Sequence, residues 1–447
     1  MFDLTNFTPW VLFSDAGIIC GLLLIGKLLR VKVRLIQKLF IPPSLLAGLL
    51  GLIFGPNGLG WLPLSSNVGT YSALLIAVVF AALPFSSPRF KMKEVAQRVG
   101  PMWAYSQFGM LFQWAVMGLF GLLVLRLIWP ELNPAFGVML PTGFYGGHGT
   151  AAAIGSAFHN LGWEEAASLG MTTATIGVIV AILGGLLFIK IATRRGQTSY
   201  LADFSALPDE YRSGLLPEEK REPTAIGTTS PISIDSHIFH LSLVMLAAFG
   251  GYMLSRGVKM AWPSLELPVF SCAFVVGILI KSIFNKAGAS RYIDPKTTVS
   301  ISSSATDLLV TCGVAAIKLG VVVKYALPLV VLTVVGIVVT IFTVFWFGRR
   351  LNKKDWFEKS IFAWGWWTGT MAMGIALLRI VDPKMQSKAM DDYALAYLPC
   401  APVEILLITF VPILFAAGAG LWLMLACLAA SLLLLLLAKR LHWWNRT

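Results

Sequence analysis

The sequence is short of charge, and it lacks the residue spacings that metal centres and common hydrolases need. Only 13% of its 447 residues are charged, against about 25% in a typical soluble domain, and 57% are hydrophobic. The five cysteines all fall in apolar runs without a C-x-x-C pair, which fits packing residues better than disulfides or metal ligands. No H-E-x-x-H or G-x-S-x-G motif occurs. These absences argue against a soluble protein and against an enzyme.

What the sequence has instead is a series of long apolar runs. They predict about eleven membrane spans, over residues 10–29, 41–62, 71–84, 102–128, 167–191, 237–255, 267–284, 306–320, 325–347, 393–415 and 417–438. The net charge of +13 lies mostly in short loops between these runs, which is typical of the positive-inside pattern. We therefore expect an all-α polytopic membrane protein in contact with lipid, and no nucleic-acid partner.

The basic loops also set the expected orientation. They place the N-terminus outside, and the linker at 194–235 and the C-terminus inside. Residues 1–3 include no basic residue, so we expect the first span, and not a cleaved signal peptide, to direct insertion. Asp15, near the outer end of that span, is expected to be a solvated helix terminus. Lys318 and Lys324 contradict the charge rule, because they would lie near the outer side.

Two apolar stretches, at 145–150 and 364–374, hold more glycine than an ordinary span needs. Glycine opens the backbone, and open backbone at membrane depth is tolerated only where it is buried in protein or lines a cavity. The alternation of basic loops then makes residues 136–160 and 361–380 re-entrant hairpins that enter from opposite sides. Gly-interrupted segments at corresponding positions of two halves indicate a transporter's binding site.

The chain also divides into two similar halves. Residues 1–193 and 236–415 each hold four spans, a hairpin and a fifth span, in opposite orientations, and residues 416–447 add a further helix. The stretch from Ile41 resembles that from Leu267, and the stretch from Gly149 resembles that from Gly369 at a similar offset. These matches favour an inverted-topology repeat joined by a cytoplasmic linker at 194–235.

The hairpin tips are the candidate site for a small anionic substrate. Backbone N–H groups and half-helix N-termini attract anions, whereas hydroxyls such as those of Thr150, Thr368 and Thr370 suit Na⁺. The candidate substrate-binding residues are Gly146, Gly147, His148, Gly149, Thr150, Gly365, Trp367, Thr368, Gly369 and Thr370. Two alternatives stay open: the glycines could serve close helix packing, and His148 could make a structural hydrogen bond to a neighbouring backbone group.

Three further residues are candidate ion ligands. Asp307 and Glu404 are acids within predicted spans, where acids are costly and usually functional, so either could bind Na⁺ or carry a proton. The alternative is an acid at a helix end paired with a base such as Lys318. Thr175 could face the core, although such threonines often bond only to their own helix backbone.

These residues together resemble the bacterial sodium/glutamate symporter family from about residue 15 to about residue 415. The stretches that carry the resemblance are Gly146-Gly147-His148-Gly149-Thr150-Ala151-Ala152, Leu265-Glu266-Leu267-Pro268-Val269-Phe270 and Ala315-Ala316-Ile317-Lys318-Leu319-Gly320. The resemblance implies a homodimer in the bacterial cytoplasmic membrane, with a scaffold and a mobile core. It also implies sodium-coupled uptake of glutamate or a related acidic amino acid by an elevator-like movement, with Na⁺ as coupling ion and no cofactor.

The second tip departs from the family pattern. Where the family has a histidine, small residues and a proline, this chain has Trp366 and Trp367. Bulk at a tip should narrow the cavity, so we expect Trp367→Gly to change which substrates bind more than it changes stability. A proton- or sodium-coupled carrier of another carboxylate is therefore the alternative. A channel is less favoured because no ring of filter carbonyls or charges is present.

Overall fold

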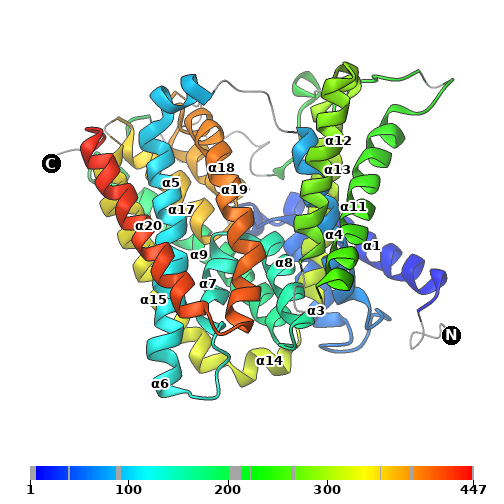
Figure 1. Ribbon diagram of the computed structural model, residues 1–447, viewed down its shortest axis with the longest axis horizontal. Helices are drawn as coiled ribbons and strands as arrows, with labels where there is room; N and C mark the ends of the chain where they lie inside the picture. The colour runs from blue at the N-terminus through cyan, green and yellow to red at the C-terminus, as the bar shows by residue number, and fades with distance from the viewer. Residues whose placement is uncertain are drawn as a thin grey trace. The chain divides into compact units, whose positions relative to one another are not determined.

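The computed structural model describes residues 7–38, 41–86, 92–200, 213–221, 223–230, 232–262, 267–352, 354–382 and 386–444 (Figure 1). Throughout these ranges the regular structure is helical, and ten helices are long and apolar enough to cross a membrane. The expected class, an all-α polytopic membrane protein, is confirmed. Leu265 and Glu266 of one family-like stretch, and residues 201–212 of the linker, lie outside the described residues.

Helices of very different length make up the chain (Figure 1). The long ones are α1 (Pro9–Lys32), α4 (Val68–Ser86), α5 (Met92–Phe120), α9 (Ala166–Arg194), α11 (Ser236–Ala261), α12 (Val269–Lys286), α13 (Pro295–Ala315), α15 (Ala326–Ile341), α19 (Ala389–Ala416) and α20 (Gly420–Arg440). The shorter ones are α2 (Arg34–Lys38), α3 (Pro43–Phe54), α6 (Arg126–Ile128), α7 (Met139–Phe144), α8 (Gly147–Asn160), α14 (Leu319–Lys324), α16 (Gly348–Leu351), α17 (Trp356–Thr368) and α18 (Met371–Val381). π-Helical segments η1 (Gly121–Leu125) and η6 (Phe342–Phe347) join α5 to α6 and α15 to α16.

Two predicted spans were wrong in extent. The span expected at 41–62 is α3, whose 12 residues rise only about 18 Å, less than the roughly 30 Å of a hydrocarbon core. The span expected at 306–320 starts much earlier, at Pro295. Asp294 caps that helix by accepting hydrogen bonds from the backbone N–H groups of Lys296 and Thr297, and a proline suits the first turn that follows. The expected start therefore fell inside the helix.

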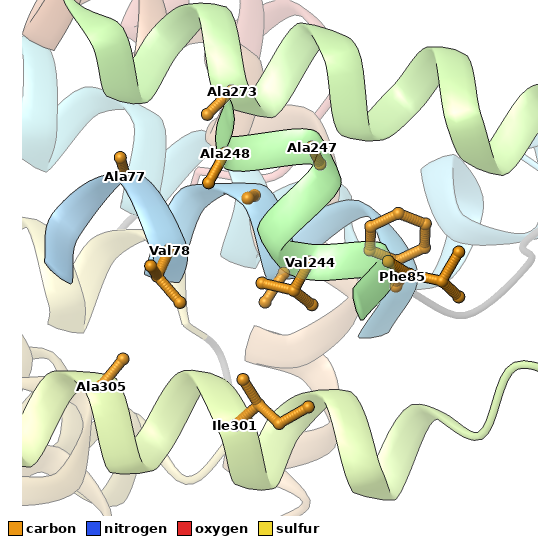
Figure 2. Close-up of a cluster of buried hydrophobic side chains, with 12 residues drawn as sticks. Ala77, Val78, Phe85, Val244, Ala247, Ala248, Ala273, Ile301 and Ala305 are labelled. Carbon is orange, nitrogen blue, oxygen red and sulfur yellow. The ribbon is translucent and has the colours of Figure 1, made fainter. Parts of the chain in front are cut away.

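The helices form two compact units, each assembled from both halves of the chain. Unit 1 comprises residues 1–27, 43–90 and 216–317. At its centre α4 packs on α13, while α3 packs on α13 and α12 packs on α4. Figure 2 shows a buried cluster of this unit with many small side chains, among them Ala77 of α4, Ala247 of α11 and Ala305 of α13. Small residues let membrane helices approach closely, which accounts for the tight core.

Asp15 of unit 1 differs from the expected solvated terminus. Its carboxylate is fully buried and accepts hydrogen bonds from the Ser65 backbone N–H at 2.9 Å, the Ser65 hydroxyl and the Tyr71 hydroxyl at 2.8 Å. A buried carboxylate needs such donors to offset its desolvation. Asp15 thus fastens α1 to the segment that leads into α4.

Unit 2 comprises residues 28–42, 91–215 and 318–447, and it contains both glycine-rich stretches. Helix α20, the additional C-terminal helix, packs along α5, and α19 packs on the same helix (Figure 1). The described beginning of the linker is attached to this unit. The Ser199 backbone N–H donates to Glu358, and the Tyr200 hydroxyl donates to Asp355, both near the start of α17.

Candidate functional site

The first glycine-rich stretch forms a helical hairpin along α9. Contacts pair Met139 with Thr173, Phe144 with Gly177, Ala151 with Gly170, and Ala167 with Gly155. Helix α7 therefore advances along α9 in the same direction, whereas α8 runs back toward the start of α9. The chain reverses at Tyr145 and Gly146, within the glycine-rich stretch.

The second stretch forms a hairpin on the same helix with the opposite approach. The Trp364 indole N–H donates to the Ala181 carbonyl at 3.0 Å, and Thr368 reaches Gly177. On the return arm, Leu377 packs on Gly185. Helix α17 thus runs against the direction of α9 and α18 runs with it. The two hairpins meet from opposite ends of α9, as the arrangement of α7, α8, α17 and α18 in Figure 1 illustrates.

The two tips touch at Gly147 and Gly369. A Cβ atom added to Gly147 would lie 3.0 Å from the Gly369 carbonyl oxygen and 3.2 Å from Cγ2 of Thr370. Gly147 also has φ of +63°, in the left-handed region that side chains disfavour. Glycine is required here both by the backbone conformation and by the close approach.

Two helix N-termini converge at this contact. Helix α8 begins after Gly146 without a side-chain cap, so the N–H groups of its first turn, from Gly147 to Gly149, point out of the helix. Helix α18 is capped by Thr370, whose hydroxyl oxygen accepts from the Met373 N–H at 3.3 Å. The positive ends of both helix dipoles therefore face the tips, an arrangement that attracts an anion.

His148 and Thr175 bond to each other. The His148 ring is buried, and its Nε2 lies 3.2 Å from the Thr175 hydroxyl. That hydroxyl donates to the Met171 carbonyl at 2.9 Å, so it accepts from Nε2–H, which assigns the tautomer. The bond joins α8 to α9. The alternative for His148 was a bond to a neighbouring backbone group, whereas the observed partner is a side-chain hydroxyl, the one that was predicted to bind an ion.

The other predicted polar and glycine residues divide between the tips and the arms. Thr150 is buried and faces Gly146, which has no room for a side chain. Thr368 donates its hydroxyl to the Trp364 carbonyl of its own helix at 2.6 Å. Gly365 lies against the backbone of Gly374, where α17 and α18 cross, so its position fits the packing alternative.

We had expected Trp367 to line an open cavity at the tip. Its side chain is instead packed inside unit 2. Its side chain is 1% exposed, and its ring centroid is 4.7 Å from that of Tyr105 and 6.1 Å from that of Tyr145. A Cβ atom on Gly109 of α5 would collide with the indole. The missing side chain at Gly109 is what accommodates the bulk of Trp367.

Glu404 is connected to the first tip through aromatic side chains. The Tyr397 hydroxyl donates to the Glu404 carboxylate at 2.7 Å, and its ring lies 5.9 Å from that of Trp366. Trp366 in turn lies 4.8 Å from Tyr145, the residue at the first reversal. Asp307 has a different setting, because it is exposed on α13 of unit 1 whereas the other predicted site residues belong to unit 2.

Sequence reasoning missed two residues of this neighbourhood. Gln113, in the middle of α5, donates to the Thr340 hydroxyl at 2.8 Å and to the Trp367 carbonyl at 3.3 Å. A polar side chain inside a span is a signal that would have singled it out. Tyr397 precedes Glu404 by two helical turns and so shares its face, a spacing that was also readable.

The fold and the paired tips define a class of protein: a polytopic membrane transporter. The profile of the sodium/glutamate symporter family matches residues 14–367, and the chain belongs to this family. It is similar to the sodium/glutamate symporters of Escherichia coli (strain K12) and Shigella flexneri, each 24% identical over 356 residues, which cover 77% of this chain and 81% of the relative. The expected family is thus confirmed. The matched region includes the first tip and ends at Trp367, before Gly369 and Thr370 of the second.

Proposed function

We propose that the protein couples the uptake of glutamate, or a related acidic amino acid, to Na⁺ in a bacterial cytoplasmic membrane. The observation that carries the proposal is the meeting of two half-helix N-termini at Gly147 and Gly369. A substrate carboxylate at the α8 N-terminus would accept hydrogen bonds from the N–H groups of Gly147, His148 and Gly149, beside Gly369 and Thr370 of the second tip. Membership of the sodium/glutamate symporter family supports this substrate class.

The tips also offer oxygen atoms for a sodium ion. The Gly369 carbonyl and the hydroxyls of Thr150 and Thr370 lie in the two tip segments. Na⁺ is a hard cation, and unwound carbonyls together with hydroxyls are its usual ligands in transporters. If ion and substrate occupy neighbouring positions, each should raise the affinity for the other, because binding linkage is reciprocal.

The division into two units supports an elevator-type movement. Both hairpins and α9 belong to unit 2, whereas unit 1 holds most of α1 with α3 and α4 from the first proposed repeat, and α11, α12 and α13 from the second. We propose that unit 2 moves with its substrate, and that unit 1 is the scaffold through which two copies pair. In the proposed repeats α3 corresponds to α12 and α4 corresponds to α13. The packing of α3 on α13 therefore has its counterpart in the packing of α12 on α4, which supports the inverted repeat.

Cysteines introduced at Asn133 and Asn160 should both be labelled from outside. Labelling from opposite sides would contradict the first re-entrant hairpin.

Glu404 favours one alternative, a proton-coupled carrier of a carboxylate. Its carboxyl group is hydrogen-bonded by Tyr397 and leads through aromatic rings to the first tip. An acid within a span is a usual proton carrier. Under this alternative the second tip, which lies beyond the matched family region, would select a substrate other than glutamate.

Uptake into proteoliposomes separates these functions. We expect concentrative, saturable uptake of labelled glutamate that requires an inward Na⁺ gradient and stops when choline replaces Na⁺. Uptake that is equal in choline, follows a pH gradient and is lost in Glu404→Gln would establish proton coupling instead. Competition by aspartate and by dicarboxylates gives the substrate class. Uptake that never exceeds equilibrium would contradict a secondary transporter.

A further inference from the structure

A cavity of unit 2 lies away from the tips, where two membrane-spanning helices end and the first arm of the second hairpin begins. It has a volume of about 570 Å³ and is formed by the end of α9, the segment from η6 to α16, and the start of α17. Cavities of about 300–1,000 Å³ are large enough for a small ligand or a lipid headgroup. The basic ends of α9 and α16 place this cavity on the predicted cytoplasmic side.

The cavity has an aromatic inner wall that opens onto exposed apolar side chains. Phe345 packs on Phe188 with ring centroids 4.7 Å apart and on Phe357 with centroids 6.3 Å apart. At the rim, Phe342 and Trp346 are 48% and 41% exposed, although both lie at the end of a span. Apolar surface at this depth faces lipid, so an acyl chain can follow the rim into the cavity.

The opposite edge of the cavity is basic. Arg349 lies over the ring of Trp356 at 4.6 Å and Arg350 over the ring of Trp346 at 4.2 Å, while Arg195 comes from the end of α9. Stacking holds a guanidinium by its face and leaves its N–H edge for a ligand. Within the described ranges, none of the three forms an ion pair with a carboxylate. The nearby acids already have partners, Tyr200 for Asp355 and Ser199 for Glu358.

The backbone that presents these groups is π-helical. Segment η6 supplies Phe342, Phe345 and Trp346, and α16 follows at once with Arg349 and Arg350. π-Helical turns inside α-helices occur frequently at functional sites, because they cost regular hydrogen bonding. Here the π-helical turn leads directly from the aromatic wall to the basic edge.

We propose that this cavity binds an anionic phospholipid. The phosphate lies against the guanidinium groups of Arg195 and Arg349, and an acyl chain follows Phe342 and Trp346 to the membrane. Arginine suits a phosphate because its planar fork donates two parallel hydrogen bonds. A free phosphate would use the same arginines, but it would fill only a small part of the cavity of about 570 Å³ and would leave its aromatic wall without a partner, so the structure favours the lipid.

Binding to purified, delipidated protein tests the proposal without any transport measurement. Native mass spectrometry and thermal shift would be followed while phosphatidylglycerol is titrated. We expect the double variant Arg195→Gln/Arg349→Gln to bind phosphatidylglycerol about thirty-fold more weakly. The matched control is Lys190→Gln/Arg194→Gln, which removes the same charge from exposed positions of α9 that do not line the cavity. An equal loss in both variants, or in neither, would overturn the site.

Two competitions on the unmodified protein identify the ligand even if the double variant fails to fold. Phosphatidylcholine, which has no net charge, should not displace phosphatidylglycerol; equal displacement would overturn the role of the arginines. Glycerol 3-phosphate should compete only weakly. If it competes as well as the lipid, the cavity is a site for free phosphate esters and the lipid proposal is wrong.

Discussion

The two hairpins share a path along α9 but are built from different residues. The first reverses at small residues, with Gly147 in a left-handed conformation and the start of α8 without a side-chain cap. The second carries Trp364, Trp366 and Trp367, all buried, and the start of α18 is capped by Thr370. An uncapped helix start leaves backbone donors for a ligand, whereas a capped one has used part of them. The comparison supports the proposal that the first tip binds the substrate, while the second arm holds the site in place.

The way each hairpin is held agrees with this division. Helices α7 and α8 approach α9 through Gly143, Gly155 and Gly170, so backbone lies close to backbone. Helix α17 instead packs through rings: Trp364 meets Phe188 of α9, and Trp366 meets Tyr393 of α19. Large side chains supply most of the packing energy in such contacts. Substitutions in the second arm should therefore act on stability, and those at the first tip on binding.

The largest effect is expected for Trp367→Gly. The indole fills the space that Gly109 leaves, so its removal creates a cavity and should cost about 3–5 kcal/mol of unfolding free energy. This reverses the expectation from sequence, that the change would mainly alter substrate choice. Thermal or denaturant unfolding in detergent measures it, with Trp422→Gly, on the exposed face of α20, as control. An unchanged midpoint with an altered substrate profile would restore the original view and undo the division between the hairpins.

At the first tip, Gly147→Val should weaken substrate binding more than it destabilises the folded protein. A side chain there would meet the Gly369 carbonyl and would need the left-handed conformation. We expect these two effects together to lower the binding free energy of glutamate by roughly 2–3 kcal/mol, or about a hundred-fold in affinity. Glutamate affinity in Na⁺ is the measurement. Gly288→Val is the control, since Gly288 has φ of +69° and open space around it. Equal loss of affinity in both variants would assign the effect to backbone strain alone.

How far the sequence could lead is clear from particular residues. The long apolar runs and the basic loops were enough to predict α4, α9, α11 and α20 as membrane spans, because each of these helices is a long, uninterrupted apolar run. The glycine-rich stretch around Gly146 was also readable, since residues 145–150 hold three glycines, more than an ordinary span needs. The direction in which the side chain of Trp367 packs was not readable, because it depends on Gly109, 258 positions earlier in the chain. The prediction that Asp15 is a solvated helix terminus was wrong for the same reason, because its hydrogen-bond donors Ser65 and Tyr71 are distant in the sequence.

The cap of the second tip should have a smaller effect. Thr370→Ala removes the hydroxyl that accepts from the Met373 N–H, and loss of such a cap costs about 1 kcal/mol of stability. It also frees one backbone donor at the tip contact, so α18 becomes more like α8. Unfolding of Thr370→Ala, compared with Thr370→Ser, which keeps the oxygen, tests the cap. If Ser and Ala destabilise equally, the Thr370 methyl group and not its hydroxyl matters.

The smallest effect should appear at the base of the first hairpin and depend on pH. Glu165, between α8 and α9, accepts from Lys324 at 3.1 Å and from the Tyr325 hydroxyl at 3.4 Å. Partial burial opposes its charge, but the hydrogen bonds from Lys324 and Tyr325 prevail and hold the pKa of Glu165 below its usual value. The native contribution is therefore complete above the unfolded pKa, about 4.3, and is lost as pH falls through the lower folded value.

Glu165→Gln imitates the protonated carboxyl group and so isolates that contribution. We expect the variant to be less stable than the native protein near pH 7 by under about 1 kcal/mol, since the pair is partly exposed. The difference between the two proteins should shrink as the pH is lowered below about 4. Thermal midpoints of both, measured side by side across that range, give the result. A difference that is the same at pH 7 and at pH 3.5 would mean that the charge of Glu165 does not hold the base of the first hairpin, and its neighbours Tyr325 and α14 would then be held by packing alone.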